Sequence, residues 1–319
     1  PLLRTIPNNT HASLTRRFAY DALTGITVNG YSLYGNRVES VTLDGVMTAR
    51  LTCGSAATAY NTNILAPRKT VGVTIEYFPS TTAPALCERY TLRNITDRAF
   101  TIEVPQIHTT YTTDPKRGVA GSYTLEVCSQ GHGTRTLAPG EEFTFGVVVS
   151  GRNANQDALV INVDEELKAR RDYLVAISSE MILETPDEVV NRAFEFAKIR
   201  ATESIIRTKG GLMHAPGGES YYAAIWANDQ AEYANPLFGM MAYEKAHQSA
   251  LNSFRHFARY MNDDYRPIPS SIIAEGDSYW NGAGDRGDAA MIAYGASRYA
   301  MAMGDMAIVE ELMPLIEWC

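Results

Sequence analysis

Two stretches of this chain place aromatic and acidic side chains directly before a helical pattern. The first, Tyr221–Pro236, contains Trp226, Asp229 and Glu232, and the second covers residues 268–288. Aromatic rings stack on the apolar faces of sugar rings. Carboxylates accept hydrogen bonds from sugar hydroxyls or transfer protons at a glycosidic oxygen. The two stretches therefore indicate a sugar-binding cleft. The alternative is a helical domain with polar helix caps and ordinary buried aromatics.

The second stretch holds two carboxylates, Glu275 and Asp277, beside Tyr279 and Trp280, and it ends at Asp288. The glycines that follow Trp280 let the backbone approach a ligand closely. A solvated loop is the alternative for this segment, and a calcium loop does not fit because no closing Glu follows. Asp288 also has the residue type preferred at a helix N-cap, and that role can coexist with ligand binding.

Metal and cofactor chemistry find no support in the sequence. The four cysteines are isolated, without a CxxC spacing, and the six histidines form no HxH or HxxxH pair. Isolated cysteines of this kind are typical of small buried hydrophobic positions. His214 lies next to the first stretch, and we expect it to have a structural role. We therefore predict no metal site and no cofactor.

Composition describes an ordinary soluble globular protein of about two domains, with 319 residues, 45% hydrophobic and 20% charged. The formal net charge of −8 and the absence of a basic stripe argue against a nucleic-acid partner. No apolar run reaches the length of a membrane span, and no signal peptide is present in the chain. The compartment and the oligomeric state stay open.

Residues 1–160 are expected to form an antiparallel β-sandwich. Segments such as Val71–Tyr77 and Phe143–Val149 alternate or cluster β-branched and aromatic residues, and turn residues separate them. Short strands at this spacing, almost without helical periodicity, favour an antiparallel arrangement. No group of residues in this half has catalytic spacing.

Helical periodicity begins near Asp164. Residues 161–184 are predicted to be a linker helix, and residues 185–319 the first, truncated part of a helical domain. Residues Thr185–Glu188 match a capping box with Pro186 at the first helical position, and the helix that starts there is expected to end at the glycine pair 210–211. Further helices are expected over 229–243, 244–261, 288–303 and 305–319. Long loops at one end of such a bundle build a pocket.

This order of elements resembles the six-hairpin (α/α)6-barrel glycoside hydrolases, and most of all relatives of the glycogen-debranching amylo-α-1,6-glucosidases. Ile225–Asp229 resembles the family's Trp-x-Arg-Asp motif, and Ile268–Ser270 its Ile-Pro-Asn loop. Gly287–Met291 resembles the following helix start. The likeness covers residues 160–319 by motif and 1–160 by architecture. Two positions depart from the pattern, with Asn228 in place of Arg and Met291 near the family's Leu-Trp.

The resemblance implies roles for particular residues. Trp226 and Asp229 would line the subsite for the non-reducing sugar, and Asp288 would be a second binding carboxylate. Glu232, one turn after Asp229, would face the cleft or pair with an arginine. Further candidates for substrate contact are Tyr279 and Trp280.

The resemblance also implies an exo-acting, inverting glycoside hydrolase, whose acid and base carboxylates we expect beyond Cys319. The chain starts without Met and stops inside a helical pattern, so we expect an N-terminal portion that is inactive alone. If the resemblance fails, Glu275 and Asp277 are the best catalytic candidates within the chain. Alternatives are a non-catalytic carbohydrate-binding protein of the same fold, which Asn228 favours, and a helical interaction scaffold.

Overall fold

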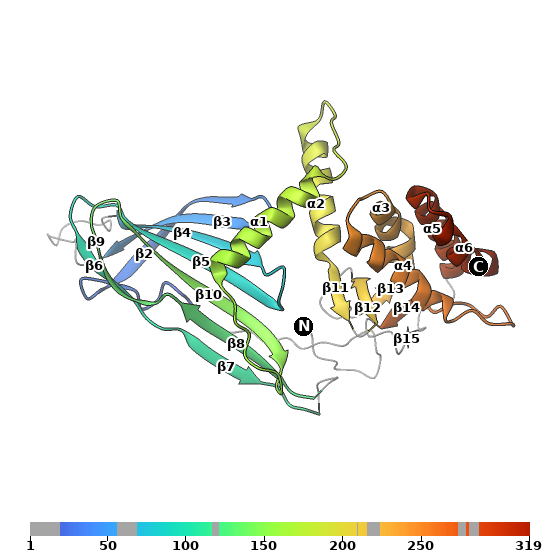
Figure 1. Cartoon of the computed structure of the whole chain (residues 1–319). Coiled ribbons are helices and arrows are strands. Elements are labelled where there is room, and N and C mark those ends of the chain that lie inside the picture. Colours follow the sequence, from blue (N-terminus) through green and yellow to red (C-terminus); the bar gives the residue numbers. More distant parts are fainter. Residues whose placement is uncertain are drawn as a thin grey trace. The chain divides into compact units, whose positions relative to one another are not determined.

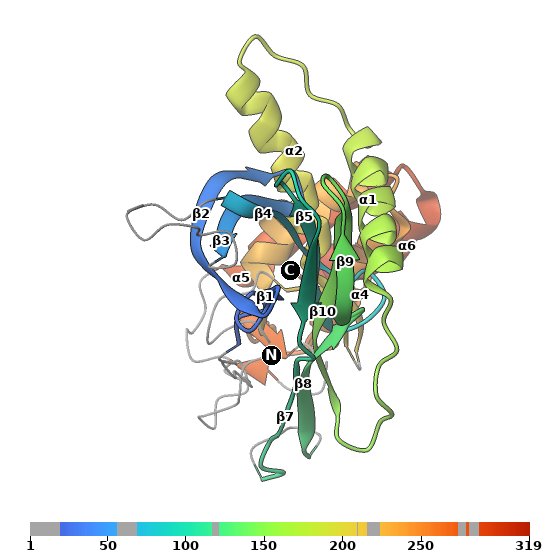
Figure 2. The same ribbon diagram turned by 90° about the vertical axis from the view of Figure 1, so that its left-hand side faces the viewer.

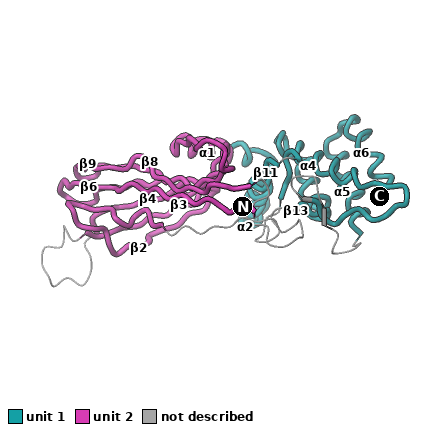
Figure 3. Tube along the Cα trace, turned by 90° about the horizontal axis from the view of Figure 1, so that it is seen from below, with its two compact units in different colours: residues 1–16, 175–319 teal, residues 17–174 magenta. Residues whose placement is uncertain are grey.

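A computed structural model of the chain describes residues 20–55, 69–116, 121–208, 210–215, 224–273, 279–280 and 287–319. Of Ala224, Ile273, Tyr279 and Trp280 it describes the backbone alone. The described residues up to Leu174 form one compact unit, and those from Val175 to Cys319 form another (Figures 1 and 3). We call them the β unit and the helical unit. No helix among the described residues combines the length and apolar character needed to cross a membrane.

The β unit is built on ten strands that hydrogen bonds join into one antiparallel sheet. Its order is β7-β8-β10-β5-β4-β3-β2-β1-β6-β9, and the sheet is strongly curled (Figure 2). The strands are β1 (Thr27–Val28), β2 (Tyr31–Leu43), β3 (Met47–Ser55), β4 (Lys69–Pro79), β5 (Ala85–Asn94), β6 (Phe100–Val104), β7 (His108–Thr112), β8 (Tyr123–Gln130), β9 (Gly133–Leu137) and β10 (Glu142–Asn153).

One face of the sheet encloses the main hydrophobic core, because the curl brings β6 and β9 over the central strands. Alternate residues of each strand point into this core, as the period of two requires. The predicted antiparallel β domain is therefore present, and its strands form a single folded sheet. The core includes Val71, Val73 and Ile75 of β4, Tyr90 and Leu92 of β5, Phe100 and Ile102 of β6, and Phe143 and Phe145 of β10.

Helix α1 (Val163–Ser179) lies across the opposite face of the sheet (Figure 1). Its residues Val163 and Leu167 pack on a second, smaller cluster that contains Phe78 and Val148. The burial of these few side chains fixes one end of the helix on the sheet.

Among its described residues, the helical unit begins with the C-terminal part of α1 and continues through five further α-helices and one π-helical turn. Its helices α4, α5 and α6 are tied together by side-chain contacts. Arg255 of α4 binds Glu311 of α6 through two bonds of 2.5 and 2.8 Å. The remaining elements are α2 (Glu188–Glu203), β11 (Ile205–Thr208), β12 (Gly211–His214), β13 (Ala224–Trp226), η3 (Asp229–Ala234), α3 (Asn235–Gly239), α4 (Glu244–Ala258), β14 (Ser271–Ile273), β15 (Tyr279–Trp280), α5 (Asp288–Met303) and α6 (Met306–Trp318).

The helix starting near Thr185 differs at both ends from the expectation. Asp187 is the N-cap, and its carboxylate accepts from the backbone N–H groups of Val189 and Val190. The helix ends at Glu203, before the glycine pair at 210–211, because a two-stranded hairpin, β11–β12, intervenes. Asp is as good an N-cap as Thr, so the residue types alone could not decide whether the helix starts after Thr185 or after Asp187.

The single helix expected over 229–243 is also different. It consists of the π-helical turn η3 followed by the short helix α3, which ends at Gly239. Pro236 lies in the first turn of α3, where a backbone N–H would have no partner within the helix, so the N–H that proline lacks costs no hydrogen bond. The helices expected over 288–303 and 305–319 are α5 and α6, with the second beginning one residue later and ending one residue earlier.

Candidate functional site

The two aromatic and acidic stretches meet in a small antiparallel sheet within the helical unit. Strand β13 pairs with β14, and β14 pairs with β15. Trp226 is opposite Ser271, and Ser271 is opposite Trp280, so the three residues occupy one line across the sheet. Two residues predicted for the same cleft, which are 54 positions apart in the sequence, are thus brought to neighbouring register positions.

Asp229 follows this sheet directly. The backbone N–H of Ala227 donates to the carbonyl of Ser270 at 2.9 Å, which holds the end of β13 against β14. The chain then turns into η3, whose first residue is Asp229. Asp229 is partly exposed, as is Trp226. The carboxylate therefore stands at the N-terminal end of a helical segment, where the backbone dipoles favour a negative charge.

Tyr233 positions the Asp229 carboxylate. Its hydroxyl donates a hydrogen bond of 2.5 Å to Asp229 Oδ1. Partial burial raises the pKa of Tyr233, and the hydrogen bond and the charge of Asp229 raise it further. Glu232, which is expected to face the cleft or pair with an arginine, is exposed. A π-helical turn is wider than an α-helical turn, so the residue above Asp229 is the one four positions on.

His214 and Gln230 form a buried polar pair beneath Asp229. The amide Nε2 of Gln230 donates to the backbone carbonyl of His214 at 2.9 Å and lies 3.3 Å from His214 Nδ1. Burial lowers the pKa of His214 to about 4, and the nearby Asp229 charge opposes that shift. The imidazole is therefore neutral near pH 7. An edge-on contact with Phe238 completes its surroundings. This agrees with the structural role expected for His214.

Several buried polar atoms around the small sheet have no hydrogen-bond partner within the described part of the chain. They are Asn228 Oδ1, Gln230 Oε1, Ser270 Oγ and Ser271 Oγ. Ser270 and Ser271 are 0% exposed and Gln230 is 1% exposed. Buried polar groups are usually hydrogen-bonded, so a cluster of this kind is typical of a place that receives water or a polar ligand. In the sequence, Asn228 and Ser270 are marked by their places in short motifs, and no local pattern predicts their burial.

Helix α5 brings Asp288 to the same end of the unit as Asp229. The backbone of α5 touches η3 so closely that a Cβ on Gly295 would lie 2.2 Å from the Ala231 carbonyl oxygen. Further along, Gly239 of α3, which follows η3 directly, packs against Tyr299 of α5. Because these contacts advance together along the two segments, the segments run parallel and begin toward the same end of the unit.

Asp288 itself is buried, with 1% exposure, whereas Asp229 is partly open. The N-cap of α5 is Gly287 in the left-handed conformation (φ 81°), and Asp288 occupies the first helical position. The two carboxylates therefore differ in their exposure to solvent. Glu275 and Asp277 lie outside the described residues, and the side chains of Tyr279 and Trp280 are not described.

Comparisons with known proteins support the fold. No family model and no curated protein sequence matches this chain. Among solved structures, it is similar to a protein assigned as a kojibiose phosphorylase from the human microbiome, with a TM-score of 0.53 and 10% identity. That alignment covers 83% of this chain and 43% of that protein. A bacterial glucoamylase complexed with acarbose also matches, over 83% of this chain and 47% of that protein, with 11% identity and a TM-score of 0.42. We draw nothing from this second likeness.

The resemblance to six-hairpin glycosidase-like proteins, expected from short motifs, is confirmed at the level of fold. At 10% identity the likeness does not extend to activity or substrate. The chain spans less than half of the length of the kojibiose phosphorylase that it matches.

Proposed function

We propose that this chain is part of an enzyme that acts on glycosidic bonds, and that its helical unit supplies the subsite for a terminal sugar ring. The observation that carries the proposal is the convergence of Trp226, Asp229 and a set of buried polar atoms at one end of the unit. An aromatic face beside a carboxylate is the combination that sugar binding needs, because the ring has an apolar face and hydroxylated edges.

Each residue has a distinct role in this proposal. Trp226 offers its ring to the sugar face. Asp229, held by Tyr233, accepts hydrogen bonds from sugar hydroxyls, and a bridging water links the sugar to the buried oxygens of Ser271 and Asn228. Asp288, which is buried, is the second carboxyl group of the proposed subsite.

The reaction that we favour is exo-acting, inverting hydrolysis. In such enzymes an acid and a base carboxylate stand roughly 6.5–9.5 Å apart across the scissile bond, so that a water fits between base and sugar. We assign sugar binding to this chain and leave the acid and the base unassigned. The likeness to a kojibiose phosphorylase favours phosphorolysis as a second candidate, with inorganic phosphate in place of that water.

Calorimetric titration of the chain with glucose, maltose and kojibiose tests the site. Trp226→Ala and Asp229→Asn are each expected to weaken binding about tenfold or more, since each removes a contact worth roughly 1.5–3 kcal/mol. Asp263→Asn is the matched control, because Asp263 is an exposed carboxylate elsewhere in the helical unit. Affinities that stay unchanged in both variants would refute the assignment.

Measuring both sugar binding and turnover distinguishes the enzyme from the carbohydrate-binding protein and from the interaction scaffold. A protein that contains this chain together with the remaining part of the enzyme is expected to release glucose, or to form glucose 1-phosphate when phosphate is supplied. A longer protein that binds sugar but does neither would be the non-catalytic carbohydrate-binding protein that Asn228 favours. A protein that binds no sugar at all would favour the interaction scaffold.

A further inference from the structure

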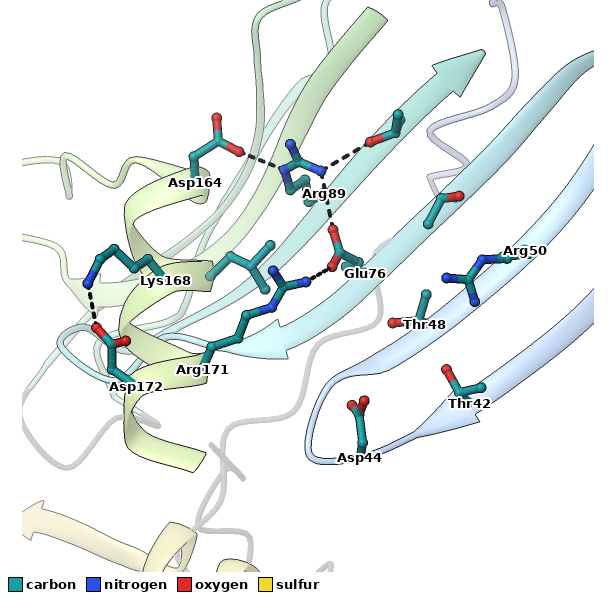
Figure 4. Close-up of a pocket in the computed structure, with 13 residues that line it drawn as sticks. Thr42, Asp44, Thr48, Arg50, Glu76, Arg89, Asp164, Lys168, Arg171 and Asp172 are labelled. Atoms are coloured by element: carbon teal, nitrogen blue, oxygen red, sulfur yellow. Dashed lines mark hydrogen bonds and ion pairs between the residues drawn. The ribbon is translucent and has the colours of Figure 1, made fainter. Parts of the chain in front are cut away.

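The β unit contains a second polar site, separate from the one in the helical unit. A cavity of about 700 Å³ opens between α1 and the outer face of strands β2 to β5 (Figure 4). This volume falls within the usual range of small-molecule sites. Its lining is almost wholly polar, with four threonines and eight charged side chains around a single leucine, Leu167.

The strand register creates this polar face. Along β4, Val73 and Ile75 point into the core while Thr74 and Glu76 point outward, as the period of two dictates. Cross-strand pairing then builds two rows: Thr42, Thr48, Glu76 and Arg89 lie opposite one another in succession, and so do Arg50, Thr74 and Thr91.

An ion-pair network makes one side of the cavity rigid. Arg89 donates to Asp164 of α1 at 2.6 Å and to Glu76 at 3.3 Å, and Arg171 of α1 donates to the other oxygen of Glu76 at 2.5 Å. The Glu76 side chain is only 9% exposed, so these bonds are partly shielded from water. The chain of four charges ties β4 and β5 to the helix (Figure 4).

The far end of the cavity is fixed as well. Arg170 donates through Nε and Nη2 to the carbonyl of Gly45 in the β2–β3 turn, at 3.1 and 2.7 Å. Gly45 also touches Leu174 so closely that any side chain there would overlap it. Helix α1 is therefore anchored at Leu167 and again at Leu174. The opening beside the helix is held at both ends.

The opposite side of the cavity has hydrogen-bonding groups that no described residue uses. Arg50 and the hydroxyls of Thr42, Thr48 and Thr74 make no hydrogen bond or ion pair with the described part of the chain. In Figure 4 the side chains of Thr42, Thr48 and Arg50 stand across from the ion-pair network. These groups are available to a ligand.

Charge balance decides the kind of ligand. The lining contains four cations and four carboxylates, so its formal charge is zero: Arg50, Arg89, Lys168 and Arg171 against Asp44, Glu76, Asp164 and Asp172. A phosphate or another anion would gain little from such a lining. A neutral molecule with several hydroxyls suits it, because each hydroxyl can donate to a carboxylate or threonine and accept from a guanidinium.

We propose that this cavity binds a neutral saccharide, as a second sugar site in the β unit. The choice of a sugar over another polyol rests on the proposed function, whereas the preference for a neutral, hydroxylated ligand rests on the lining alone. Because no aromatic side chain is among the described residues that line the cavity, the sugar is held by hydrogen bonds without ring stacking. Binding is therefore weak, with a dissociation constant on the order of 1 mM.

Hydrogen exchange of the full chain, with and without maltose, tests this proposal. Maltose is expected to slow exchange in the peptides that contain β3, β4 and the first half of α1. The concentration for half-maximal protection is expected to rise about tenfold in Arg50→Ala and severalfold in Thr48→Val. Arg93→Ala is the matched control: Arg93 is an exposed arginine on the same face of β5, outside the cavity, and its replacement should change nothing.

The outcomes separate this site from the one in the helical unit. Protection of the β unit that survives Asp229→Asn but not Arg50→Ala supports the second site even if the first fails. Protection confined to residues 224–234 and lost only in Asp229→Asn would overturn the second site while leaving the proposed function intact. Protection by inorganic phosphate without any by maltose would also overturn it, as would maltose protection of the β unit that Arg50→Ala leaves unchanged.

Discussion

The contact between Gly295 of α5 and the π-helical turn gives the sharpest test of the packing that places Asp288 and Asp229 at one end. An alanine Cβ at this position would lie 2.2 Å from the carbonyl oxygen of Ala231 and 2.6 Å from its carbonyl carbon. Both atoms belong to the backbone, so no side chain can rotate away. Helix α5 would have to move by about 1 Å before this contact returned to 3.4 Å.

Two effects of opposite sign compete in Gly295→Ala. Alanine favours a helix over glycine by about 1 kcal/mol, which would stabilise the protein if the site were open. Overpacking of a close contact costs about 1–3 kcal/mol, and a backbone obstacle lies at the upper end of that range or above it. We therefore expect a net loss of about 2 kcal/mol in the free energy of unfolding.

Urea unfolding followed by far-UV circular dichroism measures this change, and hydrogen exchange locates it. Faster exchange is expected at η3 and the first half of α5. Gly239→Ala is the matched control: its Cβ would lie 3.0 Å from Cδ2 of Tyr299, 3.1 Å from Cβ of Ala302 and 3.3 Å from the Tyr299 carbonyl oxygen, so its neighbours need to shift by only a few tenths of an ångström and its cost should be smaller. A Gly295→Ala protein that is more stable than the parent by about 1 kcal/mol would refute the close parallel packing.

Three further predictions concern single side chains of the helical unit. Lys198→Met is expected to lose about 3 kcal/mol of unfolding free energy, because the buried ammonium donates to three backbone carbonyls, and exposed Lys245→Met should lose almost none in the same urea experiment. The pKa of His214 falls from 6.5 to about 4 on folding, so the unfolded chain binds more protons between these values and stability drops as pH falls through that range, by about 3 kcal/mol in total. His214→Gln should flatten the stability–pH curve between pH 6.5 and pH 5, and an unchanged slope there would contradict the burial argument. Tyr233→Phe should weaken sugar binding about threefold by releasing Asp229, without a change in circular dichroism, and equal affinity would remove Tyr233 from the site.

Some helices and strands are determined mainly by their own residues, and local sequence patterns predicted these. Val71–Tyr77 alternates in sequence and lies within β4, and the alanine-rich stretch from Asp288 is α5 over its full predicted length. The start of α2 was two residues off, because Thr185 and Asp187 are both suitable caps and only the fold selects one.

Features that depend on distant contacts could not be predicted. The π-helical turn at Asp229 packs against Gly295, 66 positions later in the chain, and no local signal marks it. For the same reason no local signal marks Tyr233 as the hydrogen-bond partner of Asp229. The polar cavity of the β unit requires the register that sets Arg50 beside Thr74, which strand patterns alone do not fix.

Tryptophan fluorescence during a sugar titration tests the central claim most directly. The chain has three tryptophans, and the paired changes Trp280→Phe and Trp318→Phe leave Trp226 as the emitter. A sugar that stacks on Trp226 should shift or quench the emission of this variant in a saturable way. A variant that keeps only Trp318, with Trp226→Phe and Trp280→Phe, should show no response. An emission that stays constant through saturating glucose, maltose and kojibiose, or a response that persists without Trp226, would contradict a sugar subsite at this tryptophan.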